Sequence, residues 1–265
     1  SPVKINFGTI LTENMNAKRF FMIIAQMFKY IDQNQPVRFL IAECDFAMTA
    51  LTALYFAKLF NLEKKIDISP LFETDKALAT GHLVVETLVK NQHYRKYLLQ
   101  RGKICIQTGF SDAGRYLGQP AAVLSIENLQ RKIAKVLADN NLSSIKLLIF
   151  DTHGESIGRG GHPVSLEERL QYINCSYTRK KLDEWNIKLI QEVSFQGGDG
   201  YQYFLNPDLS YAALTRIAEF CLRPNQKFND DILYNSPDFG VEFVNTIKQF
   251  NTNIMDNPNY AALSN

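Results

Sequence analysis

Short runs of apolar residues recur along this chain, and segments with helical periodicity separate them. Within each run nearly every position is apolar, instead of every second one, which is typical of strands covered on both faces. Branched side chains are frequent in the runs and favour the strand conformation. The pattern therefore predicts five strands, at residues 37–42, 65–72, 103–107, 144–150 and 187–193.

The segments between the runs carry apolar residues at intervals of three and four, the spacing of an amphipathic helix. Asp45 stands where a helix N-cap is expected, and Asn61 is suited to end the same helix. After residue 200 the chain reads as helical to its end, with breaks at Pro207, Pro224, Pro237 and Pro258. We expect helices at residues 13–33, 45–61, 76–100 (two in succession), 116–140, 165–173 and 177–185.

The alternation of strands with helices predicts βαβ units and a parallel sheet. Five strands are too few for a closed eight-stranded barrel, although 265 residues are enough to hold one. We therefore expect an α/β fold in a single domain over residues 1–265. This fold is a partial (β/α)₈ barrel of the TIM type, with mostly parallel strands, additional helices and a mainly helical C-terminal third. An open sheet with a helical cap is the alternative.

The charge balance is near neutral, with 29 lysines and arginines against 27 aspartates and glutamates. This balance speaks against binding nucleic acid or an anionic membrane through bulk charge. No apolar run approaches the roughly 18 residues that a membrane span needs, and the chain does not start with a signal-peptide pattern. The four cysteines lack Cys-x-x-Cys spacing, which favours free thiols in a reducing compartment.

A glycine-rich stretch follows the fourth predicted strand. Residues 153–163 hold four glycines together with His153, Arg159 and His162. Without Cβ atoms the glycines let a ligand approach the backbone, whose N–H groups can turn toward an anion. Arg159 adds a permanent charge whose planar donors suit a carboxylate or phosphate. We predict an anion-binding loop, which differs from a P-loop because it lacks the Gly-Lys-Ser/Thr ending.

Acidic side chains follow the two preceding strands, Glu73 after the second and Asp112 after the third. The ends of parallel strands lie on one side of a sheet, so we expect these carboxylates to converge there with Arg159. Two carboxylates with open water positions commonly hold Mg²⁺ or Mn²⁺ for a phosphorylated substrate. The alternatives are a helix N-terminal carboxylate for Glu73, a turn or cap residue for Asp112 and a surface arginine for Arg159.

Four segments, in this order, resemble phosphoenolpyruvate carboxylase. Residues 68–74 (ISPLFET) are similar to the family's PLFET segment, and residues 108–112 (TGFSD) to its GYSDS segment. Residues 156–163 (SIGRGGHP) resemble the second half of its HGRGG-x-x-GRGG-x-P loop, and residues 194–197 (SFQG) its QGE segment. The resemblance extends from about residue 36 to the end of the chain.

This resemblance implies a (β/α)₈ barrel with many added helices. It also implies the addition of bicarbonate to phosphoenolpyruvate, which gives oxaloacetate and phosphate with Mg²⁺ or Mn²⁺. Glu73 and Asp112 fall on the family's metal-binding residues, and Arg115 takes the place of a lysine that follows the aspartate. Arg159 falls on an arginine that contacts the bicarbonate-derived group and phosphate. By this resemblance the substrate-binding residues are Arg159, Arg115, Gly158, Gly160 and Gln196, and the catalytic residues are Arg159 and His153.

The resemblance further implies a cytoplasmic lyase of carbon dioxide fixation that supplies the tricarboxylic acid cycle. Its partners are then phosphoenolpyruvate and bicarbonate, without nucleic acid or a membrane. The full-length protein is expected to be a homo-oligomer, because family members are tetramers.

The sequence departs from the family pattern in ways that indicate a divergent subgroup. His153 replaces the first loop arginine, Asp151 replaces the histidine before it, and Gly198 replaces the glutamate of QGE. The family's TAHPT segment, which carries its catalytic histidine, and its GSRP segment do not occur in this sequence. We therefore expect a fragment of a larger carboxylase, inactive or nearly so by itself. The alternatives are a non-catalytic anion-binding or regulatory remnant of the same barrel, and a different phosphoenolpyruvate-utilising enzyme.

Overall fold

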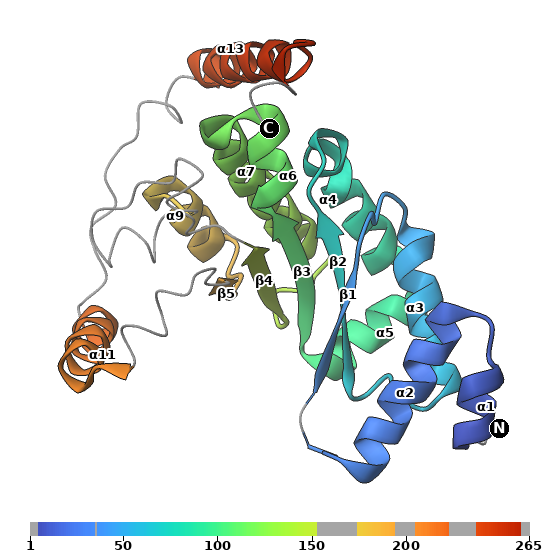
Figure 1. Cartoon of the computed structure of the whole chain (residues 1–265). Helices are drawn as coiled ribbons and strands as arrows, with labels where there is room; N and C mark the ends of the chain where they lie inside the picture. The colour runs from blue at the N-terminus through green and yellow to red at the C-terminus, as the bar shows by residue number, and fades with distance from the viewer. Residues whose placement is uncertain (1–4, 35, 153–173, 194–204, 223–236, 261–265) are drawn as a thin grey trace.

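A five-stranded parallel sheet forms the centre of the protein (Figure 1). The computed structural model describes residues 5–34, 36–152, 174–193, 205–222 and 237–260. The strands lie side by side in the order in which they occur along the chain. They are β1 (Val37–Ile41), β2 (Ile66–Phe72), β3 (Lys103–Gly109), β4 (Lys146–Thr152) and β5 (Leu189–Val193).

The strand order distinguishes a barrel from an open doubly wound sheet. In a doubly wound sheet the order reverses at a switch point, whereas in a barrel each new strand is added beside the last. The unbroken order β1-β2-β3-β4-β5, with every neighbouring pair parallel, is that of a barrel. It confirms the predicted fold class, part of an α/β barrel.

Helices connect the strands and extend both ends of the described chain (Figure 1). None of the helices in the described ranges is long and apolar enough to cross a membrane. The helices are α1 (Phe7–Thr12), α2 (Asn16–Tyr30), α3 (Ala47–Leu59), α4 (Asp75–Lys90), α5 (Gln92–Arg101), α6 (Phe110–Leu117), α7 (Gln119–Asp139), α9 (Ser176–Glu184), α11 (Pro207–Leu222) and α13 (Pro237–Met255).

The two faces of the sheet differ in chemistry. The face that packs against the connecting helices is apolar and fully buried, and it carries Ile66, Ile68, Ile104, Ile106, Leu147 and Ile149. Because successive side chains in a strand alternate between faces, Arg38, Asp67 and Lys103 lie on the opposite face. The prediction that both faces of the strands are apolar therefore holds for the helix-covered face. The opposite, inner face of the sheet also carries charged side chains.

An ion pair between the two outermost strands shows that the sheet is strongly curled. The guanidinium of Arg38 on β1 binds both carboxylate oxygens of Glu192 on β5, with Nη2 lying 3.0 Å from Oε1. In a flat sheet, four spacings of about 4.8 Å would separate these strands by about 19 Å. An arginine and a glutamate side chain do not span that distance, so the strands must curve toward one another as in a barrel.

The boundaries of several elements differ from those that the sequence predicts. No helix was predicted for residues 108–115, whereas α6 begins at Phe110 and buries an apolar stripe, Phe110, Ala113 and Leu117. Phe46, not Asp45, is the N-cap of α3 and makes no side-chain cap hydrogen bond, whereas Asn61 does take the left-handed conformation after that helix (φ 57°). The expected helix at 165–173 lies outside the described residues.

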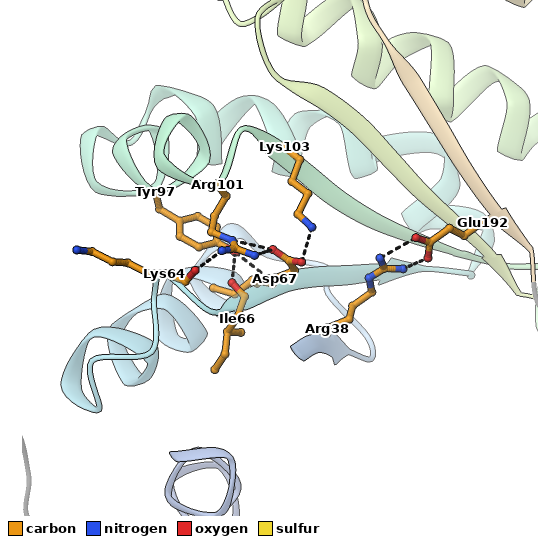
Figure 2. A network of polar contacts seen from close by, with 9 residues as sticks. Arg38, Lys64, Ile66, Asp67, Tyr97, Arg101, Lys103 and Glu192 are labelled. Atoms are coloured by element: carbon orange, nitrogen blue, oxygen red, sulfur yellow. Dashed lines mark hydrogen bonds and ion pairs between the residues drawn. The ribbon is translucent and has the colours of Figure 1, made fainter. Parts of the chain in front are cut away.

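On the side of β2 that faces β3, a tyrosine hydroxyl takes the place of strand pairing at the start of β2. Within the described strands, β2 pairs with β3 only at their carboxyl ends, through Leu71–Gln107 and Phe72–Thr108. Before that point the hydroxyl of Tyr97 on α5 donates to the carbonyl of Ile66 and accepts from the N–H of Ile68, both at 2.9 Å (Figure 2). The buried phenol therefore satisfies two backbone groups that would otherwise lack a partner.

Replacing Tyr97 by phenylalanine is expected to lower the free energy of unfolding by about 1–3 kcal/mol, because a buried donor and a buried acceptor lose their partner. Urea unfolding followed by circular dichroism measures the difference. Tyr55→Phe is the matched control, since the Tyr55 side chain is 62% exposed. A loss in Tyr97→Phe no larger than in the control would show that the hydroxyl does not stabilise β2.

Candidate functional site

Two carboxylates lie at the carboxyl ends of neighbouring strands. Glu73 directly follows β2, and Asp112 lies in the first turn of α6, which begins where β3 ends. Since β2 and β3 are adjacent and parallel, both residues leave the sheet at the same edge. We refer to Glu73 and Asp112 as the acidic pair.

A glycine at the end of β3 provides room for Glu73. A Cβ atom at Gly109 would lie 2.6 Å from the Cβ and 2.8 Å from Oε2 of Glu73, closer than real Cβ contacts allow. Glu73 therefore lies directly over the backbone of Gly109, three residues before Asp112. Any larger residue at position 109 would displace the glutamate, which gives the TGFSD segment a steric reason for its glycine.

The acidic pair is electrostatically coupled. Partial burial raises the pKa of Glu73, and the negative charges of Asp112 and then Glu43 raise it further. Glu43 follows β1 and has a left-handed backbone (φ 49°). Glu43 was not predicted as a site residue, although it carries the same signal as Glu73, a carboxylate just after a strand. Three successive strands thus end near acidic residues.

Arg115 accompanies the acidic pair on α6. Its Nη1 lies 3.8 Å from Oδ1 of Asp112, and about half of each side chain is exposed. An ion pair this long and exposed is weak, so the guanidinium can turn to another anion at little cost. The predicted substrate-binding arginine therefore lies beside one predicted metal ligand.

The acids would supply only part of a metal coordination shell. In the described part of the chain, no group of three or more histidines, cysteines, aspartates and glutamates is arranged to hold a metal ion. Mg²⁺ and Mn²⁺ nevertheless suit this donor set, because Mg²⁺ usually keeps several waters and binds one or two carboxylates together with substrate phosphate. Repulsion between Glu73 and Asp112 also favours a cation at this position.

The glycine-rich loop and the segment after β5 lie outside the described residues. This applies to His153, Gly158, Arg159, Gly160, His162 and Gln196. The described strands β4 and β5 end at Thr152 and Val193, on the same side of the sheet as the acidic pair. Whether Arg159 reaches the acids stays a prediction.

Asp151, which stands at a family histidine position, is turned away from the inner face. It is fully buried among the helices and accepts hydrogen bonds from the hydroxyl of Thr108, from Nε2 of Gln130 at 3.0 Å and from Nε2 of Gln191 at 2.9 Å. These donors come from β3, α7 and β5. The carboxylate of Asp151 therefore links β4 to β3, α7 and β5 just before the glycine-rich loop. Its role is structural.

The family model and the relatives that match this chain all belong to one family. A family model described as phosphoenolpyruvate carboxylase matches residues 12–166, which include β1 to β4, the acidic pair and Arg115. A phosphoenolpyruvate carboxylase from Shewanella loihica is 33% identical over 113 residues, which are 43% of this chain and 12% of the relative. One from Corynebacterium glutamicum is 31% identical over 104 residues, 39% of this chain and 11% of the relative.

A third relative, a phosphoenolpyruvate carboxylase from Aeromonas hydrophila, is 28% identical over 138 residues. The match covers 51% of this chain and 15% of that relative. The chain thus spans only a small part of the length of the relatives that it matches.

Glu73→Gln is expected to raise the free energy of unfolding at neutral pH. A carboxyl group whose folded pKa is raised leaves stability intact below its unfolded pKa, about 4.3, and lowers stability as the pH rises through the folded pKa. Glutamine cannot ionise, so the difference from wild type should grow with pH and vanish toward acid. Urea unfolding as a function of pH measures it, with Glu242→Gln as control, since Glu242 is exposed. A difference independent of pH would contradict the raised pKa.

Asp151→Asn is expected to lower the free energy of unfolding by about 1–3 kcal/mol, because the new amide group would point a donor at donors in a buried network. Thermal or urea unfolding measures the loss. Asp139→Asn is the control, since the Asp139 side chain is 58% exposed and pairs with Lys135 at the surface. Equal stability of the two variants would mean that Asp151 does not hold the three elements together.

Proposed function

We propose, from the premise that this chain belongs to the phosphoenolpyruvate carboxylase family, that it carries the cation-binding part of a carboxylation site. The reaction would be the addition of bicarbonate to phosphoenolpyruvate, giving oxaloacetate and phosphate. One observation supports this proposal most. Glu73 and Asp112 lie at the carboxyl ends of adjacent parallel strands, where partial burial and then the charge of Asp112 raise the pKa of Glu73.

The acidic pair would hold Mg²⁺ or Mn²⁺ in this proposal. When bound, the cation supplies positive charge next to the phosphate and the enolate oxygen of the substrate. The protein contributes the fixed position of the two carboxylates. Glu73 is fixed by its packing over Gly109, and Asp112 by the buried stripe of α6 that includes Phe110 and Ala113.

Arginine and backbone donors would bind the anionic parts of the substrates. Arg115 beside Asp112 is available for a carboxylate or phosphate, because its present ion pair is long and exposed. Arg159 and His153, with the amides of Gly158 and Gly160, would supply further donors from the glycine-rich loop, and Gln196 a polar contact after β5. These donors would offset the charge on the group being transferred.

The bond changes follow from the substrates. An oxygen of bicarbonate attacks the phosphorus of phosphoenolpyruvate, and the bond from phosphorus to the enol oxygen breaks. This gives carboxyphosphate and the enolate of pyruvate. Carboxyphosphate then separates into carbon dioxide and phosphate, and the enolate carbon adds to carbon dioxide. Cationic groups around the transferred phosphate lower the energy of each step because negative charge stays high throughout.

A non-catalytic anion-binding or regulatory protein is the second candidate. Two observations favour it: His153 stands where the family has an arginine, and Asp151 is engaged in a buried network rather than facing the inner side of the sheet. The full-length protein with labelled bicarbonate separates the two candidates. Label in oxaloacetate supports carboxylation, and binding of phosphoenolpyruvate without incorporation supports the non-catalytic alternative.

Both Glu73→Gln and Asp112→Asn are expected to weaken Mn²⁺ binding by at least about tenfold, because each removes a charged ligand. Electron paramagnetic resonance of free Mn²⁺ measures the affinity directly and needs no substrate. Asp139→Asn, an exposed acid outside the site, should bind like the wild type. Equal affinity in all four proteins would remove the proposed metal role.

A further inference from the structure

The helix α13 lies far from the acidic pair in sequence but packs against α6, the helix that carries Asp112. It comprises Pro237–Met255, beyond the residues 12–166 that match the family model. In the structure it crosses α6 and α7 at the end of the molecule to which β2 and β3 point (Figure 1). A Cβ atom on Gly118, the residue between α6 and α7, would lie 3.3 Å from Cγ2 of Ile247.

One polar contact joins α13 to the end of α6. Nδ2 of Asn251 donates a hydrogen bond of 2.6 Å to the backbone carbonyl of Arg115. This carbonyl belongs to the last turn of α6, where carbonyl groups lack partners within the helix. Asn251 therefore caps the short helix that carries Asp112 in its first turn.

A second polar contact joins α13 to the start of α4. Nζ of Lys248 lies 2.5 Å from Oδ2 of Asp75, which is in the first turn of α4, two residues after Glu73. Lys248 and Asn251 are three residues apart, so they lie on the same side of α13. One face of α13 thus contacts both α6, which carries Asp112, and the start of α4, which follows Glu73.

We infer that α13 is a clamp that sets the separation of Glu73 and Asp112, with Lys248 and Asn251 as positioning residues for the cation. The inference rests on the proposed cation site. Neither residue needs to touch the ion: Lys248 holds the segment after Glu73, and Asn251 holds the helix of Asp112. Because the metal requires its two carboxylates at a fixed distance, loosening either contact should weaken its binding.

The contacts are suited to such a test because they contribute little to folding. The side chains of Lys248 and Asp75 are 36% and 53% exposed, and exposed ion pairs add little stability. The variants Lys248→Met and Asn251→Ala should therefore fold with nearly unchanged melting temperatures. Lys248→Arg keeps the charge and should restore binding. Asn253→Ala is the matched control, because Asn253 is an exposed asparagine on the same helix.

The experiment measures Mn²⁺ affinity by electron paramagnetic resonance and amide hydrogen exchange across α6 in these variants. We expect about two- to fivefold weaker binding, the most that the loss of an exposed contact can cause, and faster exchange of residues 112–117 in Lys248→Met and Asn251→Ala. Lys248→Arg and Asn253→Ala should match the wild type. Wild-type affinity with unchanged exchange in Lys248→Met and Asn251→Ala would overturn the clamp.

A failure of the proposed cation site gives a different result. In that case the wild type itself would bind no Mn²⁺, and Glu73→Gln would make no difference. Amide hydrogen exchange alone would then test whether α13 holds α6 in place. Faster exchange of α6 in Lys248→Met and Asn251→Ala would support this role of α13, and unchanged exchange would contradict it.

Discussion

The two-pronged ion pair between Arg38 and Glu192 joins residues that are 154 positions apart in sequence, and it can form only if the sheet is curled. The hydrogen bonds from Arg38 lower the pKa of Glu192, and those to Glu192 raise the pKa of Arg38, so each partner favours the charged form of the other. In a sheet curled this way the carboxyl ends of the strands face a common centre. The acidic pair lies at two of these ends, those of β2 and β3.

Charges on the inner face also hold the amino end of β2. Asp67 is only 3% exposed, and it is bound by Arg101 at 2.5 Å and Lys103 at 2.6 Å (Figure 2). Burying a lone carboxylate would be costly, and two cations offset that cost. Together with Tyr97 this cluster stabilises the amino ends of the strands. In barrels that end commonly serves stability, whereas the carboxyl end carries the site.

The carboxyl end shows the opposite arrangement. There partial burial raises the pKa of Glu73, and the charges of Asp112 and Glu43 raise it further. A structure selected for stability alone would not gather like charges at one edge, so their arrangement agrees with the proposed cation. Lys248 and Asn251 of α13 bind the flanking segments rather than the acids themselves. This leaves the carboxylates available for a ligand.

Several local features could be predicted from the sequence, because they depend on neighbouring residues. The five strands are apolar runs, the left-handed Asn61 follows a helix, and Glu73 and Asp112 each follow a strand. The resemblance in four short segments identified the family. The helix α6 was missed because Gly109 and Gly114 resemble turn residues, and burial of Phe110, Ala113 and Leu117 outweighs that local preference.

Other features were decided only by tertiary structure, because they join residues far apart in the chain. Local patterns determined that β1 and β5 are strands, but pairing Arg38 with Glu192 requires the curled sheet. The position of α13 over α6 brings together Asn251 and Arg115, which are 136 residues apart. Asp151 stands at a family histidine position, yet the alternation of side chains along β4 turns it into the helix layer. The sequence determines which residues lie at the end of a strand, because that depends on neighbouring residues. Packing determines which of these side chains come into contact, because that depends on distant parts of the chain.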